Sequence, residues 1–443
     1  MSFPRYPVYK DSGVAWLGEV PGHWGVLPCR AFVDEQTDKN DDGKNEDYLS
    51  LMANVGIIPY AEKGDVGNKK PEDLTKCKLV SQGDFVINSM NYGIGSYGLS
   101  ALNGICSPVY IVLRPRLDRI ESRYAFRIFE NKAFQTYAQS FGNGILEHRA
   151  AINWDILKSI HVGIPPIDEQ MAILAFLDRE TGKIDALVAE QEKLIALLKE
   201  KRQAVISHAV TKGLNPAARM KDSGIEWLGE VPEHWEVKCV KHVMRSIEQG
   251  WSPQCEGFPV EAADEWGVLK VGCVNGGLFN PNENKTLPAD LEPLPELGIA
   301  AGDLLISRAN SPELVGSAAV VERNFPNLLL CDKLYRIRLN SECLPLFLAR
   351  YLGIGKVRGQ IELTATGASS SMQNIAQSTI LNLAIALPDV EEQTAIAAFL
   401  NRETTKLDAL TAEAQRAIEL LKERRIALIS AAVTGKIKVT NIQ

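Results

Sequence analysis

A repeated phrase constrains the fold of this chain more than any other feature. Residues 10–24 read "KDSGVAWLGEVPGHW" and residues 221–235 read "KDSGIEWLGEVPEHW", so twelve of fifteen positions are identical. A second repeat follows at a different offset, because residues 169–211 return as residues 392–434. The material between the two repeats therefore differs in length. Since repeats set the architecture of a chain, this pattern predicts a variable module and a constant segment, each present twice.

The second repeat has the period of a coiled coil. Positions seven residues apart are mostly apolar in both copies: Leu177, Ile184, Gln191, Leu198 and Val205, then Leu400, Leu407, Ala414, Leu421 and Leu428. Further apolar side chains are expected to fill alternate positions of the seam: Leu187, Leu194, Ile195, Leu410 and Ile418. Two matching seams on one chain favour an antiparallel helical pair. Gly182 is a candidate joint in the first helix, and Gly213 is a candidate C-terminal cap.

The variable modules have the patterns of mixed α/β domains. "GDFVINS" (83–89) and "GDLLISR" (302–308) each place a Gly-Asp turn before a short apolar strand. Later strands are expected at 109–115 and 334–339. Each module then enters a Gly-rich polar stretch before a strand that ends at a proline, Pro165 or Pro388. The expected domains are a first module at 1–166, a helix at 167–213, a second module at 214–388 and a second helix at 389–443.

Composition excludes several classes of protein. No apolar run of about 18 residues occurs, and the N-terminal residues lack the layout of a secretory signal, so we expect a cytoplasmic protein without membrane contact. The eight cysteines form no C-x-x-C pair, and with six scattered histidines they offer no metal-site spacing. The formal charge of −7 disfavours a simple, strongly basic nucleic-acid binder.

Catalytic motifs are also missing from the sequence. There is no G-x-x-x-x-G-K-[ST] phosphate loop and no Asn/Asp-Pro-Pro-aromatic tetrapeptide of the amino-methyltransferase kind. His23 and His234 occur in both copies of "HW", but neither has a nearby Ser or Cys nucleophile with a matched acid. Local packing against the adjacent tryptophan is the favoured interpretation. We therefore predict no catalytic residues.

Taken together, these motifs identify a family. The sequence resembles the specificity subunit of Type I restriction-modification systems, through the opening phrase, the two Gly-Asp strands, the helix starts "PPIDEQ" and "PDVEEQ", and "LLKEKR" and "LLKERR" near the helix ends. The resemblance covers nearly the whole chain. It implies two target-recognition domains in a pseudo-two-fold arrangement, within an α/β (α+β) fold, separated by an antiparallel pair of long coiled-coil helices.

The resemblance also implies function and partners. Such a subunit is non-catalytic, and each recognition domain binds one half of a bipartite, asymmetric site in double-stranded DNA. It assembles with two methyltransferase (modification) subunits and two restriction (translocase-nuclease) subunits. S-adenosylmethionine, ATP and magnesium are then expected only on those partners. The basic surface that the acidic chain lacks can come from the same partners.

Base-reading side chains are expected on the loops of each module. Arg suits guanine, Asn and Gln suit adenine, and small residues allow close approach. The candidates in the first module are Ser89, Asn91, Tyr92, Asn143, His148 and Arg149; those in the second are Arg308, Asn310, Ser311, Ser369, Ser370, Gln373 and Asn374. A small basic cluster of Lys69, Lys70, Lys76 and Lys78 is either a phosphate contact or a solvated face.

Two further surfaces have assigned roles. The charge runs "KEKR" and "KERR" place Lys199, Arg202, Lys422 and Arg425 near equivalent helix ends, which suits two identical partner subunits or a solvated face. The opening phrase is interpreted as a framing segment, with Trp16 and Trp227 packing where each module joins the helices. The alternative function is a coiled-coil protein-interaction scaffold that does not bind DNA.

Overall fold

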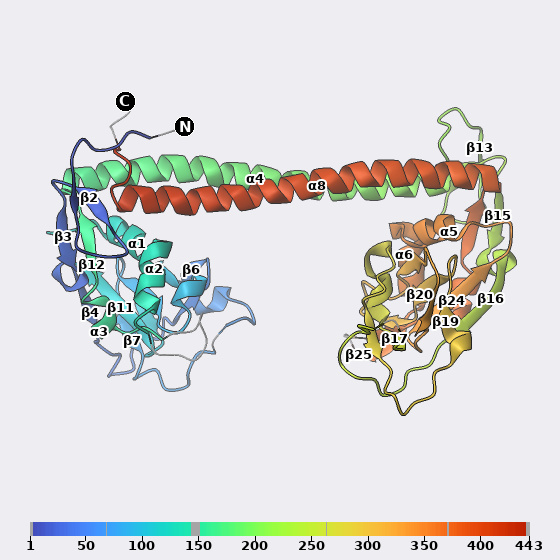
Figure 1. Ribbon diagram of the computed structural model, residues 1–443, viewed down its shortest axis with the longest axis horizontal. Coiled ribbons are helices and arrows are strands. Elements are labelled where there is room, and N and C mark those ends of the chain that lie inside the picture. Colours follow the sequence, from blue (N-terminus) through green and yellow to red (C-terminus); the bar gives the residue numbers. More distant parts are fainter. Residues whose placement is uncertain (1–2, 68, 143–150, 263, 370–371, 440–443) are drawn as a thin grey trace. The chain divides into compact units, whose positions relative to one another are not determined.

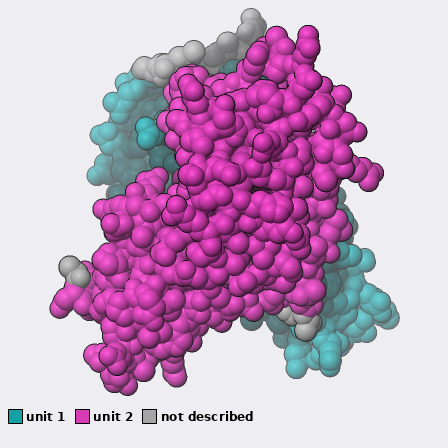
Figure 2. All heavy atoms as spheres, turned by 90° about the vertical axis from the view of Figure 1, so that its right-hand side faces the viewer, with its two compact units in different colours: residues 1–192, 415–443 teal, residues 193–414 magenta. Residues whose placement is uncertain are grey.

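The computed structural model describes residues 3–67, 69–142, 151–262, 264–369 and 372–439, and it divides into two compact units (Figure 1). Unit 1 comprises residues 1–192 and 415–443, and unit 2 comprises residues 193–414 (Figure 2). Each unit combines one module with half of each long helix. The predicted mixture of helices and strands is confirmed.

Two helices are far longer than the rest. Helix α4 spans Ile167–Lys212 with 46 residues, and α8 spans Val390–Val433 with 44 residues. The prediction of a joint at Gly182 is wrong, because α4 continues through this residue without a break. Good helix formers surround Gly182, and their backbone hydrogen bonds outweigh the cost of about 1 kcal/mol for one glycine. The predicted cap is confirmed, since Gly213 has φ +75° and its N–H donates to the Ala209 carbonyl at 3.2 Å.

Within each unit the helical halves pack in opposite directions. In unit 1 the start of α4 and the end of α8 share one core, which includes Leu177, Ile184 and Leu428. In unit 2 the end of α4 and the start of α8, with Ile206 and Leu400, share the other core. These contacts confirm the antiparallel pair and its seven-residue seam. The prediction of alternate seam positions holds for Ile418, which is buried, but is wrong for three leucines whose side chains turn to solvent: Leu187, Leu194 and Leu410.

Unit 1 is built around a four-stranded antiparallel sheet in the order β4-β11-β8-β9. These strands are β4 Val33–Gln36, β11 Tyr110–Pro115, β8 Phe85–Asn88 and β9 Tyr97–Leu99. Two-stranded pairs are β1 Tyr9–Asp11 with β2 Glu19–Pro21, β3 Gly25–Pro28 with β12 His161–Ile164, β5 Leu49–Met52 with β6 Gly56–Pro59, and β7 Lys78–Val80 with β10 Gly104–Cys106. The helices are α1 Ser122–Glu130, α2 Lys132–Gln139 and α3 Trp154–Leu157.

Unit 2 repeats this plan and adds a second four-stranded sheet and a small three-stranded sheet. The matching sheet has the order β16-β24-β20-β22, with β16 Met244–Gln249, β24 Leu334–Leu339, β20 Leu304–Ser307 and β22 Ala318–Val320. The added four-stranded sheet consists of β18 Asn284–Thr286, β17 Gly267–Leu269, β23 Phe325–Leu329 and β19 Gly298–Ile299. The pairs are β13 Met220–Asp222 with β14 Glu230–Pro232, and β15 Glu236–Cys239 with β27 Ala384–Leu387; the helices are α5 Pro345–Leu352, α6 Gly355–Thr364 and α7 Gln377–Leu381.

The opening phrase joins each module to the helices. His23 lies 2.7 Å from Glu169 in the first turn of α4, and Trp24, fully buried, donates from its indole nitrogen to the same carboxylate. The end of α8 reaches the same phrase, since Lys436 Nζ donates to the Glu19 carbonyl at 2.8 Å. The expected framing role is therefore correct.

The two predicted tryptophans differ in their contacts. Trp227 packs against the core that contains Ile206 and Leu400 of the long helices, as expected. Trp16 donates to the His161 carbonyl and packs against Phe134 on α2, so its contacts lie inside the module. Trp24 and Trp235 form the joint, because they directly precede the strands that pair with β12 and β27, the last strands before the long helices.

Candidate nucleic-acid interface

In unit 2 the two predicted base-reading stretches come together on one small sheet. Strand β21 (Ala309–Asn310) pairs antiparallel with β26 (Met372–Asn374), which pairs with β25 (Thr366–Ser369). Asn310 lies opposite Gln373 in this register. The Ile375 N–H donates to the Arg308 carbonyl at 3.0 Å and extends the pairing. Asn310 and Gln373, 63 positions apart in sequence, thus present their amide side chains at one sheet.

The side chains of this sheet are partly held by neighbouring loops. Asn310 Nδ2 donates to Asn275 Oδ1 at 3.2 Å, and its own Oδ1 accepts from the Ser311 N–H at 2.9 Å. Arg308 donates to the Asp332 carbonyl at 3.3 Å. Asn275 was not among the predicted residues, although the "NGG" turn in which it lies is the kind of segment that brings a polar side chain close to another backbone.

Unit 1 makes the equivalent backbone contact with different side chains. The Ile152 N–H donates to the Ser89 carbonyl at 3.1 Å, so the loop after β8 again meets the residues that precede the short helix α3. Ser89 Oγ lies 3.4 Å from the Val109 carbonyl, and Asn91 is partly buried. A common backbone frame therefore holds a serine in one module and an arginine in the other.

One predicted residue of unit 1 belongs to the core. The Tyr92 side chain is fully buried, and its hydroxyl donates to the Phe129 carbonyl. An aromatic ring in a Gly-rich loop suggested base stacking, but this ring packs against Tyr97, 5.5 Å away between centroids. Four other candidates, Asn143, His148, Arg149 and Ser370, lie outside the described residues, as does the side chain of Ser369.

The Gly-Asp turns fix the strands that end at these loops. Asp84, almost fully buried, accepts two hydrogen bonds from Arg114 at 2.7 and 2.8 Å, and these bonds raise the pKa of Arg114. In unit 2 Asp303 accepts from Arg338 Nε at 2.8 Å, which raises the pKa of Arg338 in the same way. The ion pair ties the turn to the adjacent strand in both modules and so positions the strand ends.

The predicted lysine cluster is only partly available to a ligand. Lys78 points inward, where its Nζ donates to the Tyr110 carbonyl at 2.8 Å. Lys70 donates to the Glu46 carbonyl at 3.2 Å and Lys76 lies 3.5 Å from Asp73. Lys69 and Lys76 are exposed and remain candidates for phosphate contacts.

The two arginines predicted to bind partner subunits, Arg202 and Arg425, each form an ion pair between the long helices. Arg202 Nε donates to Asp408 at 3.0 Å in unit 2, and Arg425 Nε donates to Asp185 at 3.2 Å in unit 1. Both pairs join α4 to α8. The arginine lies on α4 in unit 2 and on α8 in unit 1. Lys199 and Lys422, from the same charge runs, are exposed.

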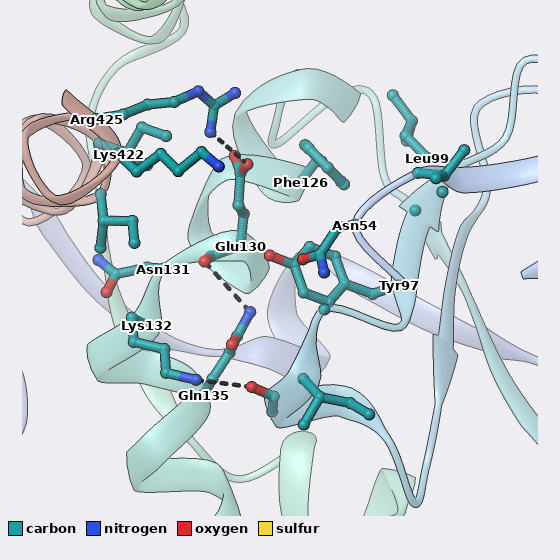
Figure 3. A pocket seen from close by; sticks show the side chains of 18 of the residues that line it. Asn54, Tyr97, Leu99, Phe126, Glu130, Asn131, Lys132, Gln135, Lys422 and Arg425 are labelled. Carbon is teal, nitrogen blue, oxygen red and sulfur yellow. Dashed lines mark hydrogen bonds and ion pairs between the residues drawn. The ribbon is translucent and has the colours of Figure 1, made fainter. Parts of the chain in front are cut away.

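Unit 1 has an open pocket of about 740 Å³ beside this helical pair (Figure 3). Its wall includes Asn54, Tyr97 and Lys132, with Lys422 and Arg425 from α8. Glu130 projects into it and lies 3.5 Å from Arg425 and 2.5 Å from Arg127. The pocket therefore carries its own carboxylate beside Arg425.

Comparison with known proteins identifies similar chains. The family described as "Type I restriction modification DNA specificity domain" matches residues 39–196 and 232–420. The MjaVIII specificity subunit of Methanocaldococcus jannaschii is 24% identical, covering 96% of this chain and 95% of that protein, and the EcoKI specificity subunit of Escherichia coli is 25% identical, covering 95% and 90%. The EcoEI specificity subunit of Escherichia coli is 29% identical, over 53% of this chain and 39% of its own length.

Solved structures share the fold. A chain from a study of complex assembly and conformational transition of the type I R-M system has a TM-score of 0.71 and 16% identity, covering 94% of this chain and 98% of its own. The HsdS subunit from Thermoanaerobacter tengcongensis has a TM-score of 0.51 and 17% identity, with the same coverage. Among the described residues, no helix has the length and apolarity that crossing a membrane requires.

Proposed function

The chain belongs to the family of Type I restriction-modification specificity subunits, and from this premise we propose that each of its modules reads one half of a bipartite, asymmetric DNA site. In this role the chain is non-catalytic. S-adenosylmethionine, ATP and magnesium are bound by the methyltransferase and restriction subunits that assemble with it in the cytoplasm.

The observation that carries this proposal is the pair of matched loop contacts. Ile152 to Ser89 and Ile375 to Arg308 are the same backbone hydrogen bond, made once in each unit. The side chains that it presents differ, and in unit 2 they include the amides of Asn310 and Gln373, which suit adenine, and the guanidinium of Arg308, which suits guanine. A common frame with different contact residues fits two half-sites of different sequence.

The long helices would fix the unread spacer between the half-sites. A continuous helix of 46 residues measures about 69 Å at ~1.5 Å per residue. One turn of B-DNA is about 34 Å. A helix of this length can place two recognition modules more than one turn apart, so helix length and spacer length should change together.

Methyltransferase subunits would dock on the outer faces of the helices. Leu187 and Leu197 on α4 are 45% and 52% exposed, and Leu410 and Leu420 at the equivalent positions of α8 are 49% and 59% exposed. Exposed apolar side chains at matching positions of the two helices form two similar surfaces, which suits two copies of one partner. The exposed Lys199 and Lys422 would contribute at the same helix ends.

Module exchange tests the proposed function. The complex of this chain with its methyltransferase subunits is compared with a complex in which residues 214–388 come from a relative of different specificity. Gel shift against random duplex, followed by mapping of the methylated bases, should show one half-site altered and the other unchanged. Assembly without any DNA binding would favour the protein-interaction scaffold instead.

A further inference from the structure

An arginine in unit 2 has lost the carboxylates that its counterpart in unit 1 binds. Arg127 on α1 and Arg350 on α5 are separated by the same 223 residues as the two copies of the helical repeat. Arg127 lies 2.5 Å from Glu130 and 3.8 Å from Asp178. The residues at those two positions in unit 2 are Gly353 and Asn401. The cation is retained there, and both of its anions are replaced by neutral residues.

Arg350 is therefore a desolvated cation with little compensation. Among the described residues, its one side-chain hydrogen bond goes from its guanidinium to Asn401 Oδ1 at 3.4 Å, and its Nε is buried without a hydrogen-bond partner. Burial lowers the pKa of Arg350 and the nearby charge of Arg202 lowers it further, while the charge of Asp408 offsets part of this shift. A buried charge normally has an anion or several hydrogen bonds around it.

This arginine lines a pocket that can admit an anion. The pocket has a volume of about 350 Å³, and three guanidinium groups line it: Arg202, Arg350 and Arg358. Two of these arginines have a carboxylate partner. Asp408 binds Arg202 at 3.0 Å, and Glu362 lies 3.9 Å from Arg358. Glu313 also lines the pocket, and its backbone carbonyl accepts from Arg358 at 3.0 Å. Arg350 is the arginine left without a carboxylate among the ion pairs of the described residues.

The pocket adjoins the candidate base-reading sheet. Its lining includes Gly276, the residue after Asn275, which accepts the hydrogen bond from Asn310. Glu313 follows two residues after Ser311 on the same loop. Phosphate contacts beside base-contacting side chains fix the register of a protein on DNA.

We propose that this pocket is an oxyanion site that takes a backbone phosphate of the DNA, with Arg350 and Arg202 as its cationic ligands. The inference rests on the proposed function. In unit 1 the Glu130 carboxylate forms an ion pair with Arg425 (Figure 3) and another with Arg127, so the chain supplies its own anion there. The two modules consequently differ in how they hold the DNA backbone as well as in the bases that they read.

The substitution Gly353→Glu tests this proposal by giving unit 2 the carboxylate of unit 1. A side chain at Gly353 meets only the Arg350 and Ala349 carbonyls, at 3.5 and 3.7 Å, so the variant should fold. Gly355→Glu is the matched control, because it adds the same charge two residues away, where a side chain has no neighbour within 4 Å. Glu130→Gly is the reciprocal variant, which removes the internal anion from unit 1.

DNA affinity is measured for the complex with methyltransferase subunits at several salt concentrations. Gly353→Glu should weaken binding about tenfold, the cost of one charge-assisted contact, and reduce the slope of log K against log salt by about 0.9, the value for one phosphate. The loss should be equal for specific and random duplex. Gly355→Glu should match the unmodified complex, and Glu130→Gly should bind more tightly with a steeper slope.

A second measurement uses the chain alone. Inorganic phosphate, exchanged for chloride at constant ionic strength, should raise the Tm of the unmodified chain more than that of Gly353→Glu, because the general stabilisation by phosphate acts on both chains. If phosphate has this effect but Gly353→Glu binds DNA normally and assembles poorly, the pocket takes a partner's carboxylate and the inference is wrong. Unchanged DNA affinity together with an equal phosphate effect on both chains also overturns it, while specific binding by the unmodified complex leaves the proposed function intact. An unmodified complex without specific DNA binding overturns both.

Discussion

The indole nitrogen of Trp24 donates a hydrogen bond to Glu169 at 3.1 Å, and Trp235 makes the same contact with Glu392 at 3.0 Å. These contacts explain why one chain contains the opening phrase twice. Each module must be fixed to the start of the long helix that follows it, and the same buried tryptophan and carboxylate do this in both units. The histidine beside each tryptophan binds the same carboxylate and has a structural role.

Removing the carboxylate should weaken this joint in a measurable way. Glu169→Ala leaves the buried Trp24 nitrogen without an acceptor and also frees Tyr6, whose hydroxyl lies 2.5 Å from Glu169. An unsatisfied buried donor costs about 1–3 kcal/mol, so the free energy of unfolding should fall by about that amount in chemical denaturation. Glu392→Ala is the matched variant and should cost less, because no tyrosine hydroxyl occupies the equivalent position. Equal losses would contradict the role given to Tyr6.

The ion pairs between the helices can be tested by exchanging charges. Arg202→Asp should weaken the helical pair of unit 2, and Asp408→Arg in the same chain should restore it. Because the Asp408 side chain is 59% exposed, the interaction is worth about 0–1 kcal/mol. A double-mutant cycle followed by urea unfolding measures the coupling energy. If the coupling energy is zero and the Arg202→Asp chain fails to assemble with methyltransferase subunits, the ion pair is not the role of Arg202 and its predicted partner binding is supported.

Stability at low pH should depend on Glu248. The hydrogen bond from the buried Arg336 lowers the pKa of Glu248 below its ordinary value of 4.5. A carboxyl whose pKa is lowered by folding stabilises the folded state above its unfolded pKa, and this stabilisation disappears as the pH falls through the folded pKa. Glu248→Gln should therefore be less stable than the unmodified chain at about pH 7, with a difference that shrinks at about pH 3. Glu226→Gln, at an exposed position, serves as the control. A stability difference between Glu248→Gln and the unmodified chain that is the same at both pH values would contradict this account.

Helix length should control the DNA spacer. Inserting one helical turn of about four residues directly after Leu198 in α4, and a matching turn directly after Thr411 in α8, lengthens the helical pair by about 5.4 Å. At about 3.4 Å per base pair, the spacer should grow by one or two base pairs while both half-sites stay the same. Methylation mapping measures this directly, and an unaltered spacer would contradict the role of the helices.

The architecture could be predicted from the sequence because repetition reveals it. The seven-residue spacing of Leu177, Ile184 and Leu198 directly predicts a buried seam, and all three are buried. Gly182 misled the prediction because a single glycine is a weak breaker when its neighbours favour helix. Leu187 was misplaced because apolar character alone does not tell a seam position from an exposed neighbour on the same helix.

The site was harder to predict because it depends on which loops meet. The chemistry of Asn310 and Gln373 makes them candidates, but only the register of β21 against β26 brings them together. Tyr92 was misplaced because loop composition does not reveal that its ring fills the core. The contrast between Arg127 and Arg350 was visible in the repeat, but its meaning needed the distances to Glu130 and Asp178.

Mapping of methylated bases in DNA modified by the complex tests the central claim most directly. The unmodified complex should methylate a site with two different half-sequences separated by a gap of fixed length and free sequence. Asn310→Ala should relax the choice of base in one half only, by about 1–3 kcal/mol of discrimination. A site without two separated halves, or relaxation in both halves at once, would contradict the claim that each module reads its own half of the DNA.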